Sequence, residues 1–469
     1  MTQSAARGPN PRRIAIVGGG ASGILLASEL ARAGADAEVA LIDPSPGRGI
    51  AYRNPEPHYL LNTRVGNMSL DPHAPEGFLK WLNANARRDA AWTAEDFAPR
   101  ARFGDYLEER LATLVAGDFG GGPTRLIRHQ ARAAEFSRGE WSVRLDSGES
   151  HAAQVVVLAT GWARPRPLLF RGREAIEALV QDDPWNLAAV DGVPDDGDVL
   201  LIGTGLTALD VAMTVWRRCP KARITAVSRH GMLPRFHGSP APSAPVLSPP
   251  YPTTARGLYT KLRTLAEAAE ADGAGRHGMF LGLRDVAAQI WAGLGLDERR
   301  MFLRHLRRYW DVERHRVPPS QAAAIRQAMA EGRFQIVRGR LTQAEQVSQG
   351  SVRVSVAGGH GIETHTVHRV INCTGPDQDP FRSRNPLIRD LLAQGKAAAD
   401  PLGLGLQVDE AGAVLDSGGA PTRGLYALGP PTQGRFFEIT AVPEIRAHAE
   451  CLAARLKSDL SARSLGRVA

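Results

Sequence analysis

The chain has few cysteines, no long apolar run and no metal-binding spacing. Only three of its 469 residues are cysteine, namely Cys219, Cys373 and Cys451. Their odd number and wide spacing argue against a disulfide framework or a zinc site, and there is no C-x-x-C pair for disulfide-reductase chemistry. The histidines form no H-E-x-x-H pattern, so no metal is expected. No uncharged apolar run reaches about 18 residues, so no membrane span is expected either.

The chain also lacks a strong excess of one charge. Lys and Arg number 57 against 49 Asp and Glu, a net charge of +8. This balance favours anionic ligands but does not indicate a nucleic-acid partner. Residues 1–11 lack the apolar core of a secretory signal, so we expect a protein of the reducing cytoplasm. With 43% apolar and 23% charged residues, the chain is typical of globular proteins, and its length suggests about three domains.

The first structured segment predicts a nucleotide-binding βαβ unit. A strand over residues 13–17 is followed by a glycine-rich turn, a helix over 24–33 and a second strand over 38–42. Glycines in such a turn let the backbone approach a pyrophosphate at the helix N-terminus, and an acidic residue after the second strand accepts hydrogen bonds from ribose. Because a second site follows, we assign FAD to this one. The predicted FAD-binding residues here are Gly18, Gly19, Gly20, Ala21, Ser22, Gly23 and Asp43.

A second unit repeats the pattern, with strands over 198–202 and 223–228 and a helix over 209–218. Its turn has Ala208 in the third position, which still allows close packing of helix on strand. The second strand ends in Ser-Arg-His and not in an acid, and an arginine at this place suits the 2′-phosphate of NADPH. The alternative is that this arginine is merely exposed; His230 and Arg235 are weaker candidates. The predicted NADP-binding residues are Gly203, Thr204, Gly205, Leu206, Thr207, Ser228 and Arg229.

Two β-branched runs bracket the second unit and suggest how the domains are connected. Residues 154–158 and 367–372 are each closed by Thr-Gly, which predicts that the NADP domain is inserted in the FAD domain. Prolines crowd residues 235–256, and the last long helix is expected from Val442 to about Lys457. The fold class is therefore α/β, with two Rossmann-like dinucleotide-binding domains and a helical segment. The predicted ranges are 12–163 and 371–460 for FAD, 164–240 and 331–370 for NADP, and 241–330 for a Pro-rich loop and helical substrate or cover segment.

Further motifs along the chain are Gly47–Tyr52, Leu60–Asn62, Met68-Ser69, Gly205–Asp210, Ser228–Pro234, Arg314–Arg316, Leu428–Pro431 and Glu438–Arg446. Together with the two glycine turns, they resemble one FAD/NAD(P)-binding family of the two-dinucleotide-binding-domain flavoproteins. The chain is also similar to the flavin-dependent N-hydroxylases that oxidise the amine of aspartate towards nitrosuccinate. Two features depart from related patterns: Phe436-Phe437 stands where a Trp is expected before Glu438, and Phe170-Arg-Gly172 lacks the His of Baeyer–Villiger enzymes, so lactone formation is not expected.

The resemblance implies three more FAD-binding residues. Gly429 would pass the ribityl–phosphate chain, and Thr440 would precede a helix whose positive N-terminus stabilises the reduced flavin. The alternative for this second segment is a turn with no cofactor contact. Asn62 would contact the flavin or the nicotinamide, or it is simply a turn residue.

An arginine-rich segment over residues 297–316 has three interpretations. It forms a solvated basic face, it binds RNA through interleaved aromatic and basic residues, or it forms a wall that binds a substrate carboxylate over the flavin. The third interpretation names Arg304, Arg314, His315 and Arg316 as substrate-binding residues.

Together with these patterns, the resemblance implies an FAD-dependent, NADPH-using monooxygenase. It would hydroxylate the amine of a small, acidic, amino-acid-like substrate with O2 through a C4a-hydroperoxyflavin, with no nucleic acid or membrane as partner. The flavin carries the chemistry, and the sequence identifies neither a catalytic side chain nor an oligomeric state. Two alternatives stay open: an NAD(P)H-dependent oxidoreductase that passes electrons to a carrier, and a non-catalytic protein that holds FAD structurally.

Overall fold

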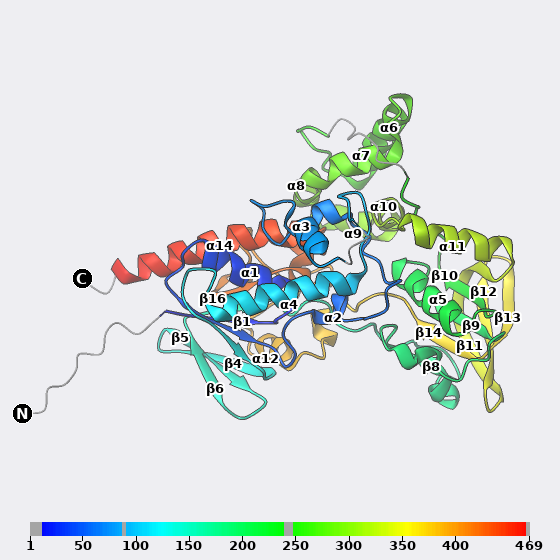
Figure 1. The fold of residues 1–469 in the computed structure, drawn as a ribbon, viewed down its shortest axis with the longest axis horizontal. Helices are drawn as coiled ribbons and strands as arrows, with labels where there is room; N and C mark the ends of the chain where they lie inside the picture. Colours follow the sequence, from blue (N-terminus) through cyan, green and yellow to red (C-terminus); the bar gives the residue numbers. More distant parts are fainter. Residues whose placement is uncertain (1–11, 87–90, 239–246, 466–469) are drawn as a thin grey trace, which may run out of the picture. The chain divides into compact units, whose positions relative to one another are not determined.

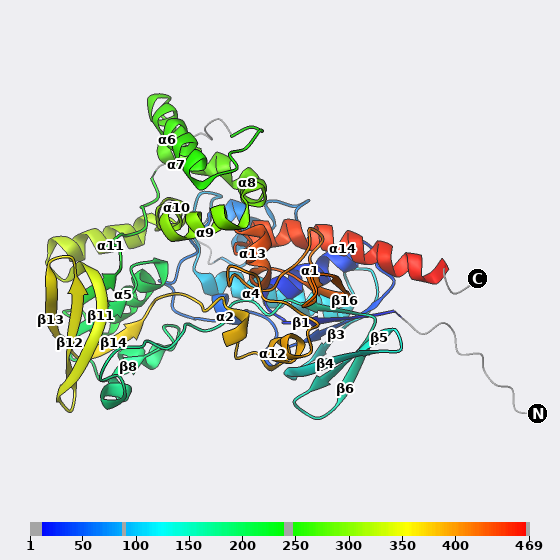
Figure 2. The same ribbon diagram turned by 180° about the vertical axis from the view of Figure 1, so that it is seen from behind.

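The computed structural model describes residues 12–86, 91–238 and 247–465, and the chain divides into two compact units (Figures 1 and 2). Unit 1 consists of Met1–Pro55, Arg64–Ala163 and Gln378–Ala469. Unit 2 consists of Glu56–Thr63 and Arg164–Asp377, so its chain interrupts that of unit 1. The Pro-rich stretch predicted over 235–256 lies partly outside the described residues.

Unit 1 is built on a six-stranded sheet in the order β15-β16-β7-β1-β2-β3. All neighbouring strands are parallel except the edge pair of β15 and β16, which is antiparallel. The inner strands are apolar on both faces, as expected for a parallel sheet that is covered on both sides. The strands are β1 (Arg13–Val17), β2 (Glu38–Ile42), β3 (Thr124–Ile127), β7 (Val155–Leu158), β15 (Ala413–Leu415) and β16 (Pro421–Ala427).

Two different layers cover this sheet (Figure 1). One face carries α1, which packs beside both α4 and the C-terminal α14. The other face packs against a three-stranded antiparallel sheet of β4, β5 and β6 and against α12, around the fully buried Trp141. The bounds are α1 (Ala21–Arg32), α4 (Arg100–Ala116), α12 (Pro386–Ala393), α14 (Val442–Leu465), β4 (Ala131–Ser137), β5 (Glu140–Leu145) and β6 (Ser150–Ala153). Shorter helices are α2 (Gly49–Tyr52), α3 (Gly77–Ala84) and α13 (Gln433–Phe436).

Unit 2 has a seven-stranded sheet in the order β13-β12-β11-β10-β9-β14-β8. The strands from β11 to β8 are parallel, whereas β11, β12 and β13 form an antiparallel meander. Ser228 at the end of β10 pairs with Arg338 of β11. This register brings Arg229, which follows β10, close to the arginines of β11. The strands are β8 (Val180–Gln181), β9 (Asp198–Ile202), β10 (Arg223–Ser228), β11 (Phe334–Ser348), β12 (Ser351–Gly358), β13 (Gly361–Val367) and β14 (Arg369–Asn372).

Helices cover one face of this sheet and also form a separate helical segment. The apolar sides of α5 and α11 pack on β9, β10 and β14. From Ala255 to Ala330 the segment between β10 and β11 consists mainly of helices α6 to α11, which confirms the helical character expected over residues 257–330. The helices are α5 (Leu206–Arg218), α6 (Ala255–Ala271), α7 (Gly275–Leu283), α8 (Ala287–Gly293), α9 (Leu296–His305), α10 (Arg307–Arg314) and α11 (Pro319–Ala330).

A buried polar network binds the short segment Glu56–Thr63 into unit 2. The His58 Nε2 atom lies 2.9 Å from the Thr214 hydroxyl of α5. The Gln321 amide of α11 donates to the His58 carbonyl at 2.8 Å and to the Asp210 carboxylate at 2.9 Å. Burial lowers the pKa of His58 to about 4, so its imidazole is neutral at neutral pH. Because these buried hydrogen bonds join the segment to both helices, they hold it against α5 and α11.

The predicted strands 13–17, 38–42, 198–202 and 223–228 are confirmed with the same bounds. Helices α1 and α5 begin three residues earlier than predicted, because each starts directly after the glycine of its turn. The strand expected over 367–372 is shorter: Val367 ends β13, and the segment from Arg369 is β14 of the unit 2 sheet.

Candidate functional site

In the first glycine turn, directly after β1, the backbone passes so close to neighbouring atoms that side chains would clash with them. Gly18 has φ +117°, and a Cβ there would lie 2.2 Å from the Ala159 carbonyl oxygen. A Cβ at Gly23 would lie 1.9 Å from the Gly18 carbonyl oxygen. Glycine at these two positions therefore allows α1 to start directly against the end of the strand.

The N-terminus of α1 is suited to bind an anion. Gly20 is its N-cap and supplies no side chain to accept from the helix amides. Within the described residues, the amides of Ala21, Ser22 and Gly23 find no acceptor in the protein. A phosphate bound at this turn would accept from these amides and gain from the helix dipole.

Asp43 and Gly429 lie against this turn. The Asp43 carboxylate accepts from the Gly19 amide at 2.8 Å and from the Ser45 amide at 2.7 Å, which leaves further lone pairs for ribose hydroxyls. Gly429 has φ +75°, and a Cβ there would lie 2.5 Å from the Ser22 hydroxyl. The segment after β16 thus packs against the first turn of α1, although the two are about 400 residues apart in the sequence.

The other two predicted FAD-binding residues, Thr440 and Asn62, do not contact the first glycine turn through any hydrogen bond in the described part of the chain. Thr440 is half-buried just before α14, where its amide donates to the Glu438 carbonyl at 2.8 Å. Asn62 belongs to unit 2, where its carbonyl lies 3.1 Å from the His237 Nε2 atom.

The second glycine turn repeats the construction of the first. A Cβ at Gly203 would lie 2.4 Å from the Cys373 carbonyl oxygen, whereas a Cβ at Gly205 would meet no atom within 4 Å. Gly205 is the N-cap of α5, and the amides of Leu206 and Thr207 have no protein acceptor among the described residues. The turn is therefore open to an anion, and a side chain at Gly205 would fill the space that a pyrophosphate needs.

Thr204 and Ser228 hold this turn against the loop that follows β10. The Thr204 hydroxyl donates to the Met232 carbonyl at 2.6 Å and lies 3.0 Å from the Ser228 hydroxyl. The Ser228 hydroxyl in turn accepts from the Gly231 amide at 3.1 Å. These hydrogen bonds connect the second glycine turn to the residues after β10 and use the hydroxyls of both side chains.

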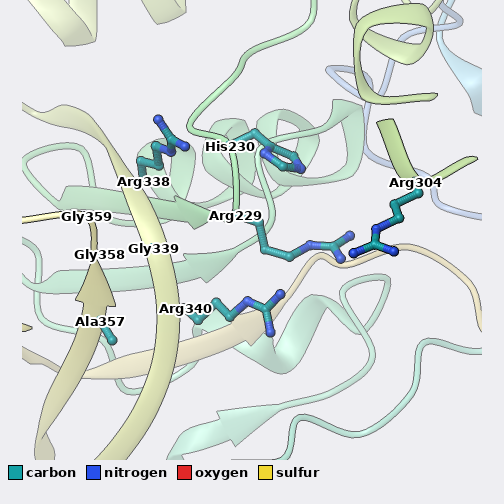
Figure 3. Close-up of a pocket in the computed structure, with 9 residues that line it drawn as sticks. All are labelled: Arg229, His230, Arg304, Arg338, Gly339, Arg340, Ala357, Gly358 and Gly359. Atoms are coloured by element: carbon teal, nitrogen blue, oxygen red, sulfur yellow. The ribbon is translucent and has the colours of Figure 1, made fainter. Parts of the chain in front are cut away.

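A cavity of about 510 Å³ lies at the end of β10 and is lined with arginines (Figure 3). Burial lowers the pKa of His230, and the neighbouring charges of Arg308, Arg229, Arg338 and Arg340 lower it further. No carboxylate is among the lining residues. Such a positive potential attracts anions, and the lack of a lining carboxylate argues against the ribose-binding acid that an NADH site uses. The lining residues are Arg229, His230, Arg304, Arg338, Gly339, Arg340, Ala357, Gly358 and Gly359.

The four residues predicted to bind substrate do not form one group. Arg304 lines the cavity at Arg229, and Arg314 and His315 lie half-buried at the end of α10. Arg316 is buried, and its guanidinium donates to the Glu313 carboxylate at 2.9 Å and to the Phe236 carbonyl at 3.2 Å. Those bonds give Arg316 a structural partner inside unit 2.

Arg338 and Arg340 were missed by the sequence analysis. Their i, i+2 spacing places both on the same face of β11, but only the pairing of β11 with β10 brings them to the cavity that Arg229 lines. An R-x-R pattern in a strand is too common on solvated faces to be recognised without that pairing.

Other chemistries find little support in the described part of the chain. No group of three or more His, Cys, Asp or Glu side chains there could hold a metal ion. Cys219 and Cys373 are buried, and burial raises the pKa of both thiols, which opposes thiolate chemistry. None of the described helices combines the length and the apolar composition that a bilayer crossing requires.

Comparison with known proteins identifies the first domain and the fold. A family model described as FAD-NAD(P)-binding matches residues 15–163, the range that contains the first glycine turn and Asp43. A search of curated proteins by sequence finds no match. Residues 15–163 are thus an FAD/NAD(P)-binding domain, as the sequence predicts.

Solved structures resemble the whole chain at low identity. The ornithine N-hydroxylase of Kutzneria sp. 744, with reduced FAD, NADP+ and L-ornithine, is 15% identical with a TM-score of 0.64, covering 96% of this chain and 100% of its own. The L-lysine 6-monooxygenase of Pseudomonas syringae is 19% identical with a TM-score of 0.61, covering 96% and 99%. A bacillithiol disulfide reductase from Staphylococcus aureus is 14% identical with a TM-score of 0.56, covering 96% and 99%. The chain therefore has the Rossmann-like fold of FAD/NAD(P)-binding oxidoreductases, which confirms the predicted fold class.

Proposed function

We propose that the chain is an FAD- and NADPH-dependent monooxygenase that hydroxylates the nitrogen of a small amine. The observation that carries this proposal is the pair of open glycine turns, of which the second adjoins a cavity lined by arginines and free of carboxylates. Support also comes from the fold, which N-hydroxylating monooxygenases share over nearly the whole chain.

Unit 1 would hold FAD. The amides at the start of α1 would bind the pyrophosphate, and Asp43 would accept from the ribose hydroxyls. Gly429 would let the rest of the cofactor pass close to the backbone, and Thr440 with the N-terminus of α14 would lie at its flavin end. The bound flavin supplies hydride acceptance from the nicotinamide and the activation of oxygen.

Unit 2 would hold NADPH. The open turn from Gly203 to Thr207 would bind the pyrophosphate through the amides at the start of α5. Arg229 would bind the 2′-phosphate, for which a guanidinium is well suited. In the net reaction, NADPH supplies two electrons, one oxygen atom enters an N–H bond of the substrate, and the other leaves as water.

We further propose that the substrate carries a carboxylate, aspartate being one candidate. Of the residues predicted to bind substrate, Arg314 and His315, half-buried at the end of α10, would bind the carboxylate, and Arg316, which donates to Glu313, would not. Truncating an arginine that pairs with a desolvated carboxylate leaves the substrate charge without a partner, which weakens binding strongly.

The test is an NADPH-oxidation screen with mass spectrometry for products that gain one oxygen atom and with peroxide measured in parallel. Aspartate, glutamate, ornithine and lysine would be compared with cadaverine, a diamine that has no carboxylate. We expect at least one amino acid to give a hydroxylated product, and Arg314→Ala or His315→Ala to divert oxygen to peroxide while NADPH still reduces the flavin. Hydroxylation of cadaverine alone would refute the carboxylate requirement.

A reductase that passes electrons to a carrier is the second candidate, favoured by the similarity to the bacillithiol disulfide reductase. It predicts rapid NADPH oxidation with a quinone or disulfide acceptor and no oxygenated product from any amine. A flavin that NADPH does not reduce would contradict both enzymes and favour a structural role for FAD.

A further inference from the structure

The cavity beside the second glycine turn contains more positive charge than a single phosphate-binding arginine explains. Four arginines line it, and they come from three elements: Arg229 follows β10, Arg338 and Arg340 lie on β11, and Arg304 lies on α9. In the described part of the chain, none of the four forms an ion pair or a side-chain hydrogen bond with another residue. Their charges are therefore available to a ligand.

The directions of these side chains divide the four arginines into two groups. Figure 3 shows the guanidinium groups of Arg229 and Arg304 pointing toward one another, with that of Arg340 extending to the same side from β11. Arg338 points away from them, although it lines the same cavity. Like charges that face one another repel, and a dianion bound between them offsets this repulsion by its attraction to each guanidinium.

Three glycines leave part of the cavity wall without side chains. Gly339, Gly358 and Gly359 line it on the side of Arg338 in Figure 3, and a Cβ at Gly359 would meet no atom within 4 Å. A phosphomonoester offers three terminal oxygens and nearly two negative charges, which suits recognition by several guanidinium groups.

We propose that Arg304 and Arg340 complete, together with Arg229, a three-arginine clamp for the 2′-phosphate of NADPH. This inference rests on the proposed use of NADPH and adds the residues that set its specificity. It moves Arg304 from the substrate site to the coenzyme site. Because Arg304 lies on α9, coenzyme binding would also hold the helical segment to the edge formed by β10 and β11.

The clamp can be tested without enzyme turnover by titrating the FAD-loaded protein with 2′,5′-ADP and with 5′-AMP in a calorimeter. These probes differ only in the 2′-phosphate. We expect the wild type to bind 2′,5′-ADP more tightly, and Arg304→Gln and Arg340→Gln each to weaken it by about ten- to a hundredfold, since a charge-assisted contact is lost. Binding of 5′-AMP should change by less than about twofold.

Arg338→Gln is the matched control, because it removes the same charge from the same cavity at a side chain that points away. It should weaken 2′,5′-ADP by less than about threefold, the effect of a screened charge at longer range. Equal losses in all three variants would overturn the clamp in favour of a diffuse positive field. Wild-type binding in both Arg304→Gln and Arg340→Gln would overturn it as well, while the use of NADPH would stand.

A second measurement separates the clamp from the proposed function. Hydrogen exchange of the α9 amides should slow with 2′,5′-ADP but not with 5′-AMP, and this protection should be lost in Arg304→Gln. If the wild type does not distinguish 2′,5′-ADP from 5′-AMP, the assignment of NADPH itself is wrong. If it does distinguish them and α9 exchanges at the same rate with either probe, the role of Arg304 is refuted.

Discussion

Two glycines of the first turn should respond to alanine in different ways, although they stand three residues apart. A Cβ at Gly23 would lie 1.9 Å from the Gly18 carbonyl oxygen, a distance that only a shift of α1 away from β1 can relieve. A Cβ at Gly20 would meet its nearest neighbour, the Gly49 Cα, at 3.4 Å, which is an ordinary contact. Gly20 also has an extended backbone with φ −85°, which alanine adopts without strain.

The expected magnitudes follow from these contacts. Overpacking costs about 1–3 kcal/mol, and alanine in a helix returns up to about 1 kcal/mol, so Gly23→Ala should lose about 1–2 kcal/mol of unfolding free energy. For a unit of about 250 residues such as unit 1, that loss corresponds to a fall in Tm of about 2–8 °C in the FAD-free protein. Gly20→Ala should shift the Tm of the FAD-free protein by less than about 2 °C but should lower FAD affinity at least about tenfold, because its methyl group occupies the approach of the pyrophosphate.

The assay combines thermal unfolding of FAD-stripped protein with fluorescence titration of FAD. Gly34→Ala serves as a control in the same unit: Gly34 has φ +64° and no neighbour within 4 Å of an added Cβ, so alanine there costs stability without touching the turn. It should retain FAD affinity. Wild-type FAD affinity in Gly20→Ala would refute the placement of the pyrophosphate, and an unchanged Tm in Gly23→Ala would refute the packing argument.

Three further predictions concern other sites. Arg229→Ala should raise the KM for NADPH about ten- to a hundredfold and leave that for NADH nearly unchanged, and equal changes for both coenzymes would count against its role. Arg316→Ala should destabilise unit 2 by about 1.5–3 kcal/mol in thermal unfolding, because buried Glu313 loses its bond to Arg316 and keeps only the Arg235 guanidinium at 3.3 Å and that of Arg276 at 3.9 Å, whereas a substrate-binding role would raise the substrate KM at unchanged Tm. Burial lowers the pKa of His448 to about 4, and its enclosed ring nitrogens have no hydrogen-bond partner in the described structure. The unfolded chain therefore binds the extra proton between about pH 6.5 and 4, the unfolding free energy falls as the pH drops through that window, and His448→Leu should flatten this fall in acid denaturation curves.

The sequence by itself determined the two glycine turns and the helices and strands beside them. Each turn, its helix and the next strand lie within about thirty residues, and the physical demands on them are local: a glycine where the chain must fold back, an open helix N-terminus and a polar residue after the second strand. Such demands are visible as spacing, which is why β1, β2, β9 and β10 were predicted with the bounds that the structure shows.

Only the tertiary structure decided which distant residues join these turns. Gly429 packs against Ser22, and Arg304 and Arg340 line one cavity with Arg229. Both arrangements arise from the pairing of strands and the packing of helices that are far apart in the sequence. The arginine-rich segment 297–316 shows most clearly what the sequence cannot predict. Its arginines look alike in the sequence, yet Arg316 is buried against Glu313 while Arg304 lines the cavity beside Arg229. An arginine whose guanidinium lies within about 4 Å of an internal carboxylate forms an ion pair with it, whereas one without such a neighbour can bind a ligand. Only the fold sets that distance.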